Sequence, residues 1–155
     1  MLEQARQRTQ EFQTRLRDAK TDIALITDES SIAYLAGFWG YLSIEFGRPT
    51  FLIVRPGEAP VVITPAMESE MVSAMTWIDD VRTWEDSGPD RWENVLSRAL
   101  GDDVKEIGIE AAALPAIVRN WFQDQRPGTG LTNISGFLGA MRMVKSPAEI
   151  HVMRQ

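Results

Sequence analysis

The chain opens with a helical pattern of apolar and polar positions. One face of this first segment carries Leu2, Ala5, Thr9, Phe12, Leu16 and Ala19. These positions recur every three or four residues, and those between them are mostly arginine, glutamine and glutamate. The spacing predicts an amphipathic helix whose apolar face packs on the rest of the protein.

Short apolar runs and further helical patterns alternate along the rest of the chain. Apolar runs bounded by turn residues predict strands at 22–26, 50–54, 59–64, 77–84, 106–110 and 131–134. Helical periods predict helices at 29–36, 67–75, 91–100, 114–122 and 135–144. A short turn joins the second and third strands, which we expect to form a hairpin. Residues 38–49 show no clean period.

Local start and stop signals support this assignment. Asp28 can cap the helix at 29–36, and Gly37 suits the left-handed turn that closes it. Ser135 is the expected cap of the helix at 135–144. Alternating helices and strands with one antiparallel hairpin predict an α/β fold, a three-layer α/β/α domain around a mixed β-sheet. We expect this domain to span residues 1–142.

Net charge and the lengths of the apolar runs limit the classes of binding partner and the cellular compartment that we expect. A net charge of −6 argues against non-specific binding to nucleic acid or anionic membranes, because such binding requires positive charge to neutralise phosphates. No apolar run approaches the ~20 residues of a membrane span, and the amino terminus lacks the apolar segment of a signal peptide. We therefore expect a cytoplasmic protein with no nucleic-acid and no membrane partner.

Several catalytic signatures are absent from the sequence. There is no cysteine, which excludes thiolate chemistry and cysteine-based zinc sites. The single histidine, His151, lies among the last residues. The sequence contains neither the G-x-S-x-G elbow nor the glycine-rich dinucleotide and phosphate-loop motifs. We predict no catalytic, cofactor-binding or metal-binding residue in this chain.

Carboxylates and tryptophans each allow a functional and a structural interpretation. The acids in ITPAMESE and WIDDV could bind a hard cation or act as an acid–base couple. We interpret them instead as a helix start and a strand end that face water. Trp92 and Trp121 stand at helical spacing with apolar neighbours and are expected in the core. Trp39, beside glycines in the irregular segment, is the candidate for binding.

The last residues carry the signals of a helix start. Ser146 and Glu149 have the spacing of a capping box, with Pro147 at the first helical position. Ile150 and Met153 would begin an apolar stripe that needs a partner surface. We therefore expect residues 143–155 to be a junction and the first turns of a further, C-terminal domain, so that the chain is part of a longer protein.

Two segments together resemble a known family. One is Tyr34-Leu35-Ala36-Gly37-Phe38, which matches a Y-L-[ST]-G-F-like stretch. The other, more specific, runs from Arg142 to Glu149 and matches an R-x-[IVL]-K-[ST]-x-x-E junction. Both are similar to the N-terminal domain of the creatinase, aminopeptidase P and prolidase family, and the element order agrees along the whole chain.

The resemblance implies a hydrolase of C–N bonds, either amide or amidino, whose catalytic residues lie in the missing domain. Some members hold two divalent metals (Mn, Co or Zn) there, and creatinase-like members are metal-free. The family's N-terminal domain supports a homodimer, and the substrate is a dipeptide or another small molecule. The resemblance places no cofactor in the present chain.

The same resemblance suggests substrate contacts in the segment WGYLSIEFGRPTF, because in the family this loop reaches toward a neighbouring subunit's active site. Phe46 and Arg48 belong to an F-G-R element similar to one by which creatinase contacts its substrate. A guanidinium suits a carboxylate, and an aromatic ring can cover an apolar or cationic group. Trp39 and Tyr41 are expected to line the same pocket. The structural alternative is a solvated loop arginine and a phenylalanine that plugs the core.

The function classes that remain open differ in substrate or in activity. Many aminopeptidase P and prolidase relatives lack the F-G-R element, so the loop favours a creatinase-like substrate over plain Xaa-Pro specificity. A second hypothesis is a catalytically inactive binding or scaffold module of the same fold. A third is an independent small-molecule-binding domain.

Overall fold

The computed structural model describes the backbone of residues 1–155 and the side chains of all of them except Ile44. Six strands form one sheet: β1 (Ala24–Ile26), β2 (Phe51–Val54), β3 (Val61–Pro65), β4 (Asp80–Trp84), β5 (Glu106–Ile109) and β6 (Gly130–Asn133). Their order is β4-β3-β2-β1-β5-β6. β2 runs antiparallel to both of its neighbours, and all other pairs are parallel. The predicted mixed sheet and hairpin are confirmed.

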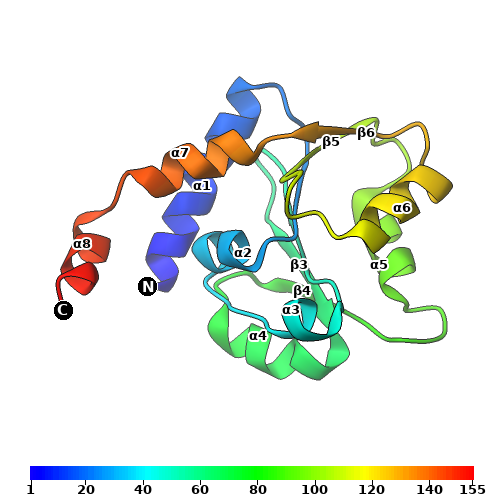
Figure 1. The fold of residues 1–155 in the computed structure, drawn as a ribbon, viewed down its shortest axis with the longest axis horizontal. Helices are drawn as coiled ribbons and strands as arrows, with labels where there is room; N and C mark the ends of the chain where they lie inside the picture. Colours follow the sequence, from blue (N-terminus) through cyan, green and yellow to red (C-terminus); the bar gives the residue numbers. More distant parts are fainter.

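Helices cover both faces of this sheet (Figure 1). They are α1 (Leu2–Asp18), α2 (Glu29–Ala36), α3 (Leu42–Phe46), α4 (Ser69–Met75), α5 (Trp92–Leu100), α6 (Ala116–Gln125), α7 (Ser135–Met143) and α8 (Pro147–Met153). A 3-10 turn, η1 (Ala66–Glu68), precedes α4. Helices α1, α2, α4 and α7 pack on one face, and α5 and α6 pack on the other. The predicted three-layer α/β/α fold is confirmed.

Side-chain alternation along the strands creates the two halves of the core. In β1, Ala24 and Ile26 pack with Phe12 of α1, while Leu25 faces the opposite layer with Phe122 of α6. Successive residues of a strand point to opposite faces, so a strand buried on both sides reads as a continuous apolar run. This is why the first strand shows no apolar–polar alternation in the sequence.

The core tryptophans form part of an aromatic row in the α5–α6 layer. The ring centroids of Phe51 and Trp92 are 5.7 Å apart, and those of Trp92 and Trp121 are 5.8 Å apart. Trp121 in turn contacts Phe122 at 4.9 Å. Tilted and edge-on pairs at these separations add to the stability gained from burial. The expected core position of Trp92 is confirmed, whereas Trp121 is partly buried and packs against this core from its edge.

The observed helix ends confirm one predicted cap and correct another. Asp28 accepts a hydrogen bond from the Ser31 backbone N–H at 2.9 Å, and Gly37 closes α2 with φ of 80°. Ser135 does not cap α7, because it is already the first helical residue. The N-cap position is held by Ile134, which has no capping side chain, and Asn133 Oδ1 accepts from the Ser135 backbone N–H at 3.1 Å. No helix of the described chain is both long and apolar enough to cross a bilayer.

Candidate functional site

The segment that shows no period in the sequence contains the short helix α3 and carries all four predicted substrate-binding residues. Trp39, Tyr41 and Phe46 are 50%, 47% and 64% exposed, respectively. Phe46 therefore does not plug the core, which removes the structural alternative for that residue. Large exposed aromatic side chains grouped on one segment are typical of a surface that meets a ligand or another protein.

Arg48 follows Gly47, which ends α3 in the left-handed conformation with φ of 63°. Its guanidinium forms an ion pair with Asp86 and also contacts Met67 Sδ at 2.9 Å. Its side chain is 27% exposed. The guanidinium of Arg48 is therefore held against a carboxylate of this chain, that of Asp86.

A small hollow of about 180 Å³ lies beside Arg48. Trp84 and Trp92 line it, together with Asp86 and Arg91. The other three predicted residues are outside its lining, so a pocket shared by all four stays a prediction. Ligand sites are usually about 300–1,000 Å³ in volume. The hollow is smaller than that range.

Glu68 is the residue of this region that the sequence interpretation misplaces. The sequence predicts that the acids of ITPAMESE face water, but Glu68 is buried, with 3% exposure. Its carboxylate accepts hydrogen bonds from the backbone N–H groups of Tyr41 and Leu42, each at 3.4 Å. An acid at the edge of a helix shows no sequence signal for burial, because its partners are backbone groups of another segment.

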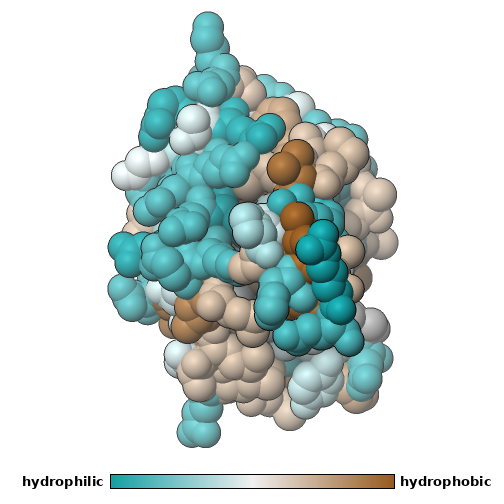
Figure 2. Space-filling model, turned by 90° about the vertical axis from the view of Figure 1, so that its left-hand side faces the viewer, coloured by the Kyte–Doolittle hydropathy of each residue, from teal (hydrophilic) through white to brown (hydrophobic). Residues whose placement is uncertain are grey.

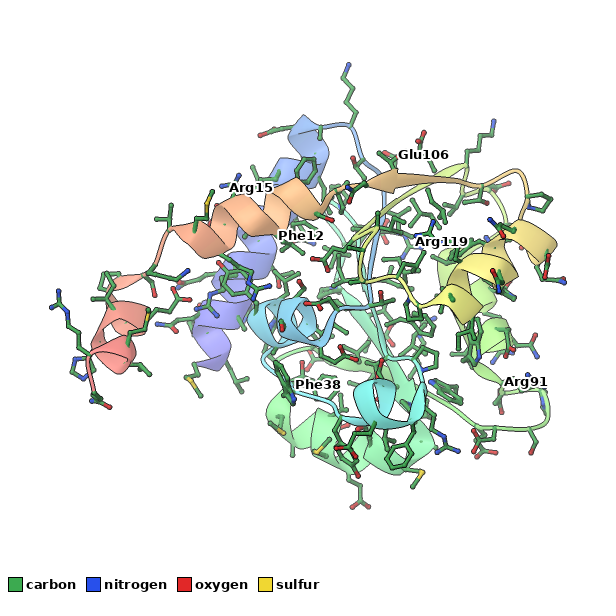
Figure 3. All side chains as sticks on the ribbon, in the orientation of Figure 1. Phe12, Arg15, Phe38, Arg91, Glu106 and Arg119 are labelled. Atoms are coloured by element: carbon green, nitrogen blue, oxygen red, sulfur yellow. The ribbon has the colours of Figure 1, made fainter. Side chains whose placement is uncertain are left out.

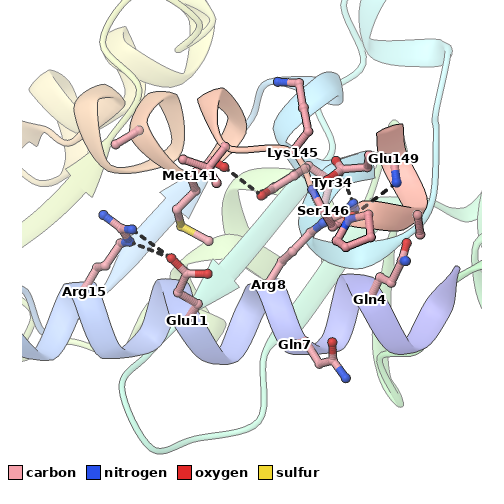
Figure 4. A pocket seen from close by; sticks show the side chains of 14 residues that line it. Gln4, Gln7, Arg8, Glu11, Arg15, Tyr34, Met141, Lys145, Ser146 and Glu149 are labelled. Carbon is pink, nitrogen blue, oxygen red and sulfur yellow. Dashed lines mark hydrogen bonds and ion pairs between the residues drawn. The ribbon is translucent and has the colours of Figure 1, made fainter. Parts of the chain in front are cut away.

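A second hollow, about 770 Å³ in volume, runs between α1 and the junction from α7 to α8 (Figure 4). Arg8 is its central side chain. The guanidinium lies 4.3 Å from the centre of the Tyr34 ring and forms an ion pair with Glu149 at 2.8 Å. The Tyr34 hydroxyl donates to the Met141 backbone oxygen at 3.3 Å. These contacts join α1, α2, α7 and α8, and no sequence motif marks Arg8 for this role.

The junction motif forms its predicted local structure. Ser146 Oγ accepts from the Glu149 backbone N–H at 3.2 Å, and Glu149 Oε2 accepts from the Ser146 backbone N–H at 2.8 Å. The latter bond lowers the pKa of Glu149. Lys145 donates to the backbone oxygen of Arg142. The capping box is confirmed. The face that carries α8 and the start of α1 is mixed, with hydrophilic stretches beside sizeable apolar areas (Figure 2).

Glu110 is a further titratable group, at the carboxyl end of β5. It receives a hydrogen bond from Ser31 Oγ at 2.9 Å, whereas its Oε2 is buried with no partner among the described residues. Burial raises the pKa of Glu110, since a charged carboxylate is poorly solvated there. Asp28 raises it further by repulsion, and the Ser31 hydrogen bond opposes both effects.

This raised pKa predicts a pH dependence of stability. Between the ordinary and the raised pKa of Glu110, the folded chain binds more protons than the unfolded one, so the free energy of unfolding falls as pH rises through that window. Glu110→Gln should lack this fall. Denaturant unfolding of the 155-residue chain between about pH 4 and pH 8 measures the difference. Glu106→Gln, at the exposed start of the same strand, is the control. Parallel curves for the parent and Glu110→Gln would contradict the assignment.

Both the sequence and the fold are similar to those of known proteins. Residues 8–144 match the family model of the creatinase/prolidase N-terminal domain. An Xaa-Pro dipeptidase of Lactobacillus helveticus is 30% identical over 138 residues, which cover 87% of this chain and 36% of that relative. The chain thus spans about a third of the length of the curated relative.

Solved structures give the same result. A proline dipeptidase from Streptococcus pneumoniae superposes with a TM-score of 0.76 at 25% identity, covering 88% of this chain and 98% of that one. A recombinant prolidase from Thermococcus sibiricus shares the fold with a TM-score of 0.78 at 21% identity, covering 93% of this chain and 38% of that one. Family model, relative and fold agree, and the chain belongs to the creatinase/prolidase N-terminal domain family.

Proposed function

We propose that this chain is the amino-terminal domain of a longer cytoplasmic hydrolase of the Xaa-Pro peptidase type. Residues 1–142 would form the domain, and residues 143–155 would lead into a catalytic domain. The observation that carries the proposal is the 30% identity with an Xaa-Pro dipeptidase across 87% of this chain. That relative is much longer than the chain, which fits a division of labour between two domains.

In this proposal, the role of the present domain is to contact the substrate. Arg48 is the central residue, because a guanidinium can hold a carboxylate through two parallel hydrogen bonds. A dipeptide with a free terminal carboxylate offers that group. In the structure the guanidinium of Arg48 is paired with the carboxylate of Asp86, which supports its ability to bind an anion. Phe46, Trp39 and Tyr41 would cover apolar parts of the same substrate.

The exposed aromatic side chains also support the proposed homodimer. Phe46 and Trp39 lie at least half in solvent. Enclosing such groups against a second copy would remove apolar surface from water, which favours association. The small hollow beside Arg48 would then be completed by the second copy and its catalytic domain.

Bond breaking is assigned to the other domain. Among the described residues no three metal-binding side chains come together. We assign the divalent metals (Mn, Co or Zn) that some family members hold to the other domain. Where such metals are bound, they activate a water for attack on the scissile carbonyl. No step of that chemistry is assigned to residues of this chain.

The activity of the full-length protein tests the proposal. It should be incubated with an Xaa-Pro dipeptide, with the matching Xaa-Ala dipeptide and with creatine, and product formation followed. We expect hydrolysis of the Xaa-Pro dipeptide alone, because the similarity to an Xaa-Pro dipeptidase extends over 87% of this chain, whereas the creatinase-like preference rests on the F-G-R element alone. Hydrolysis of creatine instead would transfer the assignment to a creatinase-like enzyme. A folded protein that cleaves none of the three would contradict a hydrolase and favour the binding or scaffold module.

A further inference from the structure

We propose that Glu68 is the positioning residue of the substrate loop, which is the segment of residues 39–48. The proposal rests on the proposed function, because it explains how the candidate substrate-binding side chains are held in place. Glu68 itself would touch no substrate. Its carboxylate would fix the start of α3, and thereby the direction in which Trp39, Tyr41 and Arg48 are presented.

The contacts of Glu68 all lead to the loop or to the sheet beneath it. One carboxylate oxygen, Oε1, accepts from the backbone N–H groups of Tyr41 and Leu42 at 3.4 Å each. The other, Oε2, accepts from Thr64 Oγ1 at 3.2 Å, and Thr64 lies in β3. Thr64 is in turn 3.4 Å from the hydroxyl of Thr50. The carboxylate thus links the loop to two neighbouring segments of the core.

The burial of Glu68 is unusual for its residue type. Glutamate is rarely buried to 3% exposure unless it is paired. Among the side chains that the structure describes, no lysine or arginine forms an ion pair with it. Burying a carboxylate removes it from water, which is unfavourable unless hydrogen bonds compensate. Here the compensating donors are two loop amides and one hydroxyl, so the carboxylate holds the loop backbone in place.

Packing around the carboxylate is tight at Gly40. A Cβ placed on Gly40 would lie 3.4 Å from Glu68 Oε2 and 2.9 Å from the ring of Phe38. The backbone at Gly40 therefore passes close to the carboxylate, and the tight contact that a side chain at this position would make is with Phe38.

A second tether holds the other end of the loop. Trp84 is buried in β4, and its indole N–H donates to the Pro49 backbone oxygen at 2.9 Å. Arg48 directly precedes this point. With Glu68 at the start and Trp84 at the end, the residues between them present exposed side chains on a fixed backbone. Preorganised binding groups lose less entropy when a substrate binds.

Kinetics and hydrogen exchange on the full-length protein test the proposal. The variants are Glu68→Ala, Glu68→Gln and, as a matched control, Glu70→Ala, which removes an exposed acid two residues away. With an Xaa-Pro dipeptide, Glu68→Ala should raise KM about tenfold and change kcat less than about twofold, since only binding is disturbed. The amides of Tyr41 and Leu42 should exchange faster. Glutamine keeps an acceptor oxygen, so Glu68→Gln should stay within about twofold of the parent in KM.

Each alternative outcome is decisive. If Glu68→Ala changes neither KM nor the exchange of the two amides, the proposal is overturned. It is also overturned if the variant loses stability while KM stays the same, because Glu68 would then have a purely structural role. If Glu68→Ala does not fold, Thr64→Val, which removes only the hydroxyl partner, should show a smaller rise in KM. If Arg48→Ala leaves KM unchanged, the proposed function fails by itself, and the exchange of the two amides still decides whether Glu68 orders the loop.

Discussion

Replacing Phe38 with alanine is expected to lower the free energy of unfolding of the 155-residue chain by about 3–5 kcal/mol. Phe38 is fully buried in the core layer between the sheet and α1, α2 and α4. It stands where the chain leaves α2 toward the substrate loop (Figure 3). Truncation removes its apolar contacts and leaves a cavity that a packed core cannot fill completely.

The neighbouring residue provides the control for this prediction. Trp39 is half exposed, so Trp39→Ala should cost only about 0.5 kcal/mol, although it removes a larger side chain. Equilibrium unfolding in denaturant compares the two variants under identical conditions. Equal losses at the two positions would contradict the described placement of the loop, because burial would then not separate them.

Arg48→Ala is expected to lower kcat/KM of the full-length protein for an Xaa-Pro dipeptide by about 10- to 100-fold. A hydrogen bond to a charged group contributes about 1.5–3 kcal/mol, and each 1.4 kcal/mol corresponds to a factor of ten. The change should appear mainly in KM, since the arginine holds a part of the substrate that does not react. The fold should persist, because Arg48 is a loop residue that is partly exposed and outside the core.

Arg98→Ala is the matched control for the arginine. Arg98 is also ion-paired, at 3.0 Å from Asp90, but it is exposed and does not line the hollow beside Arg48. Its removal should change kcat/KM by less than about twofold, since exposed ion pairs contribute little. Initial-rate kinetics over a range of dipeptide concentrations separate KM from kcat. If the two substitutions lowered kcat/KM equally, the loss would reflect the removal of a positive charge in general and would contradict a specific role of Arg48.

Much of the fold could be predicted from the sequence because period and local signals agree there. Asp28 and Gly37 lie at the two ends of α2, as predicted. The continuous apolar runs form strands that are buried on both faces. Helix α3 was beyond this approach, since five residues are too few to establish a helical period. The start of α7 was placed one position too late, because the N-cap position is Ile134, whose side chain carries no capping signal.

The candidate site divides in the same way. Arg48 and the aromatic residues were found through the chemistry and resemblance of one contiguous segment. Glu68 and Arg8 were not, because their roles arise from partners far along the chain: Glu68 contacts Tyr41, and Arg8 contacts Glu149. Sequence patterns report local periodicity, whereas a buried acid beneath a loop is a property of the folded arrangement.

The central claim is that Arg48 of this domain holds the carboxylate of an Xaa-Pro substrate. The most direct test measures kcat/KM of the full-length parent and of Arg48→Ala, each with an Xaa-Pro dipeptide and with its C-terminal amide. We expect the substitution to cost about 10- to 100-fold with the free acid and less than about twofold with the amide, which lacks the charge that the guanidinium binds. The same loss with both substrates would contradict the account, because Arg48 would then not act on the carboxylate.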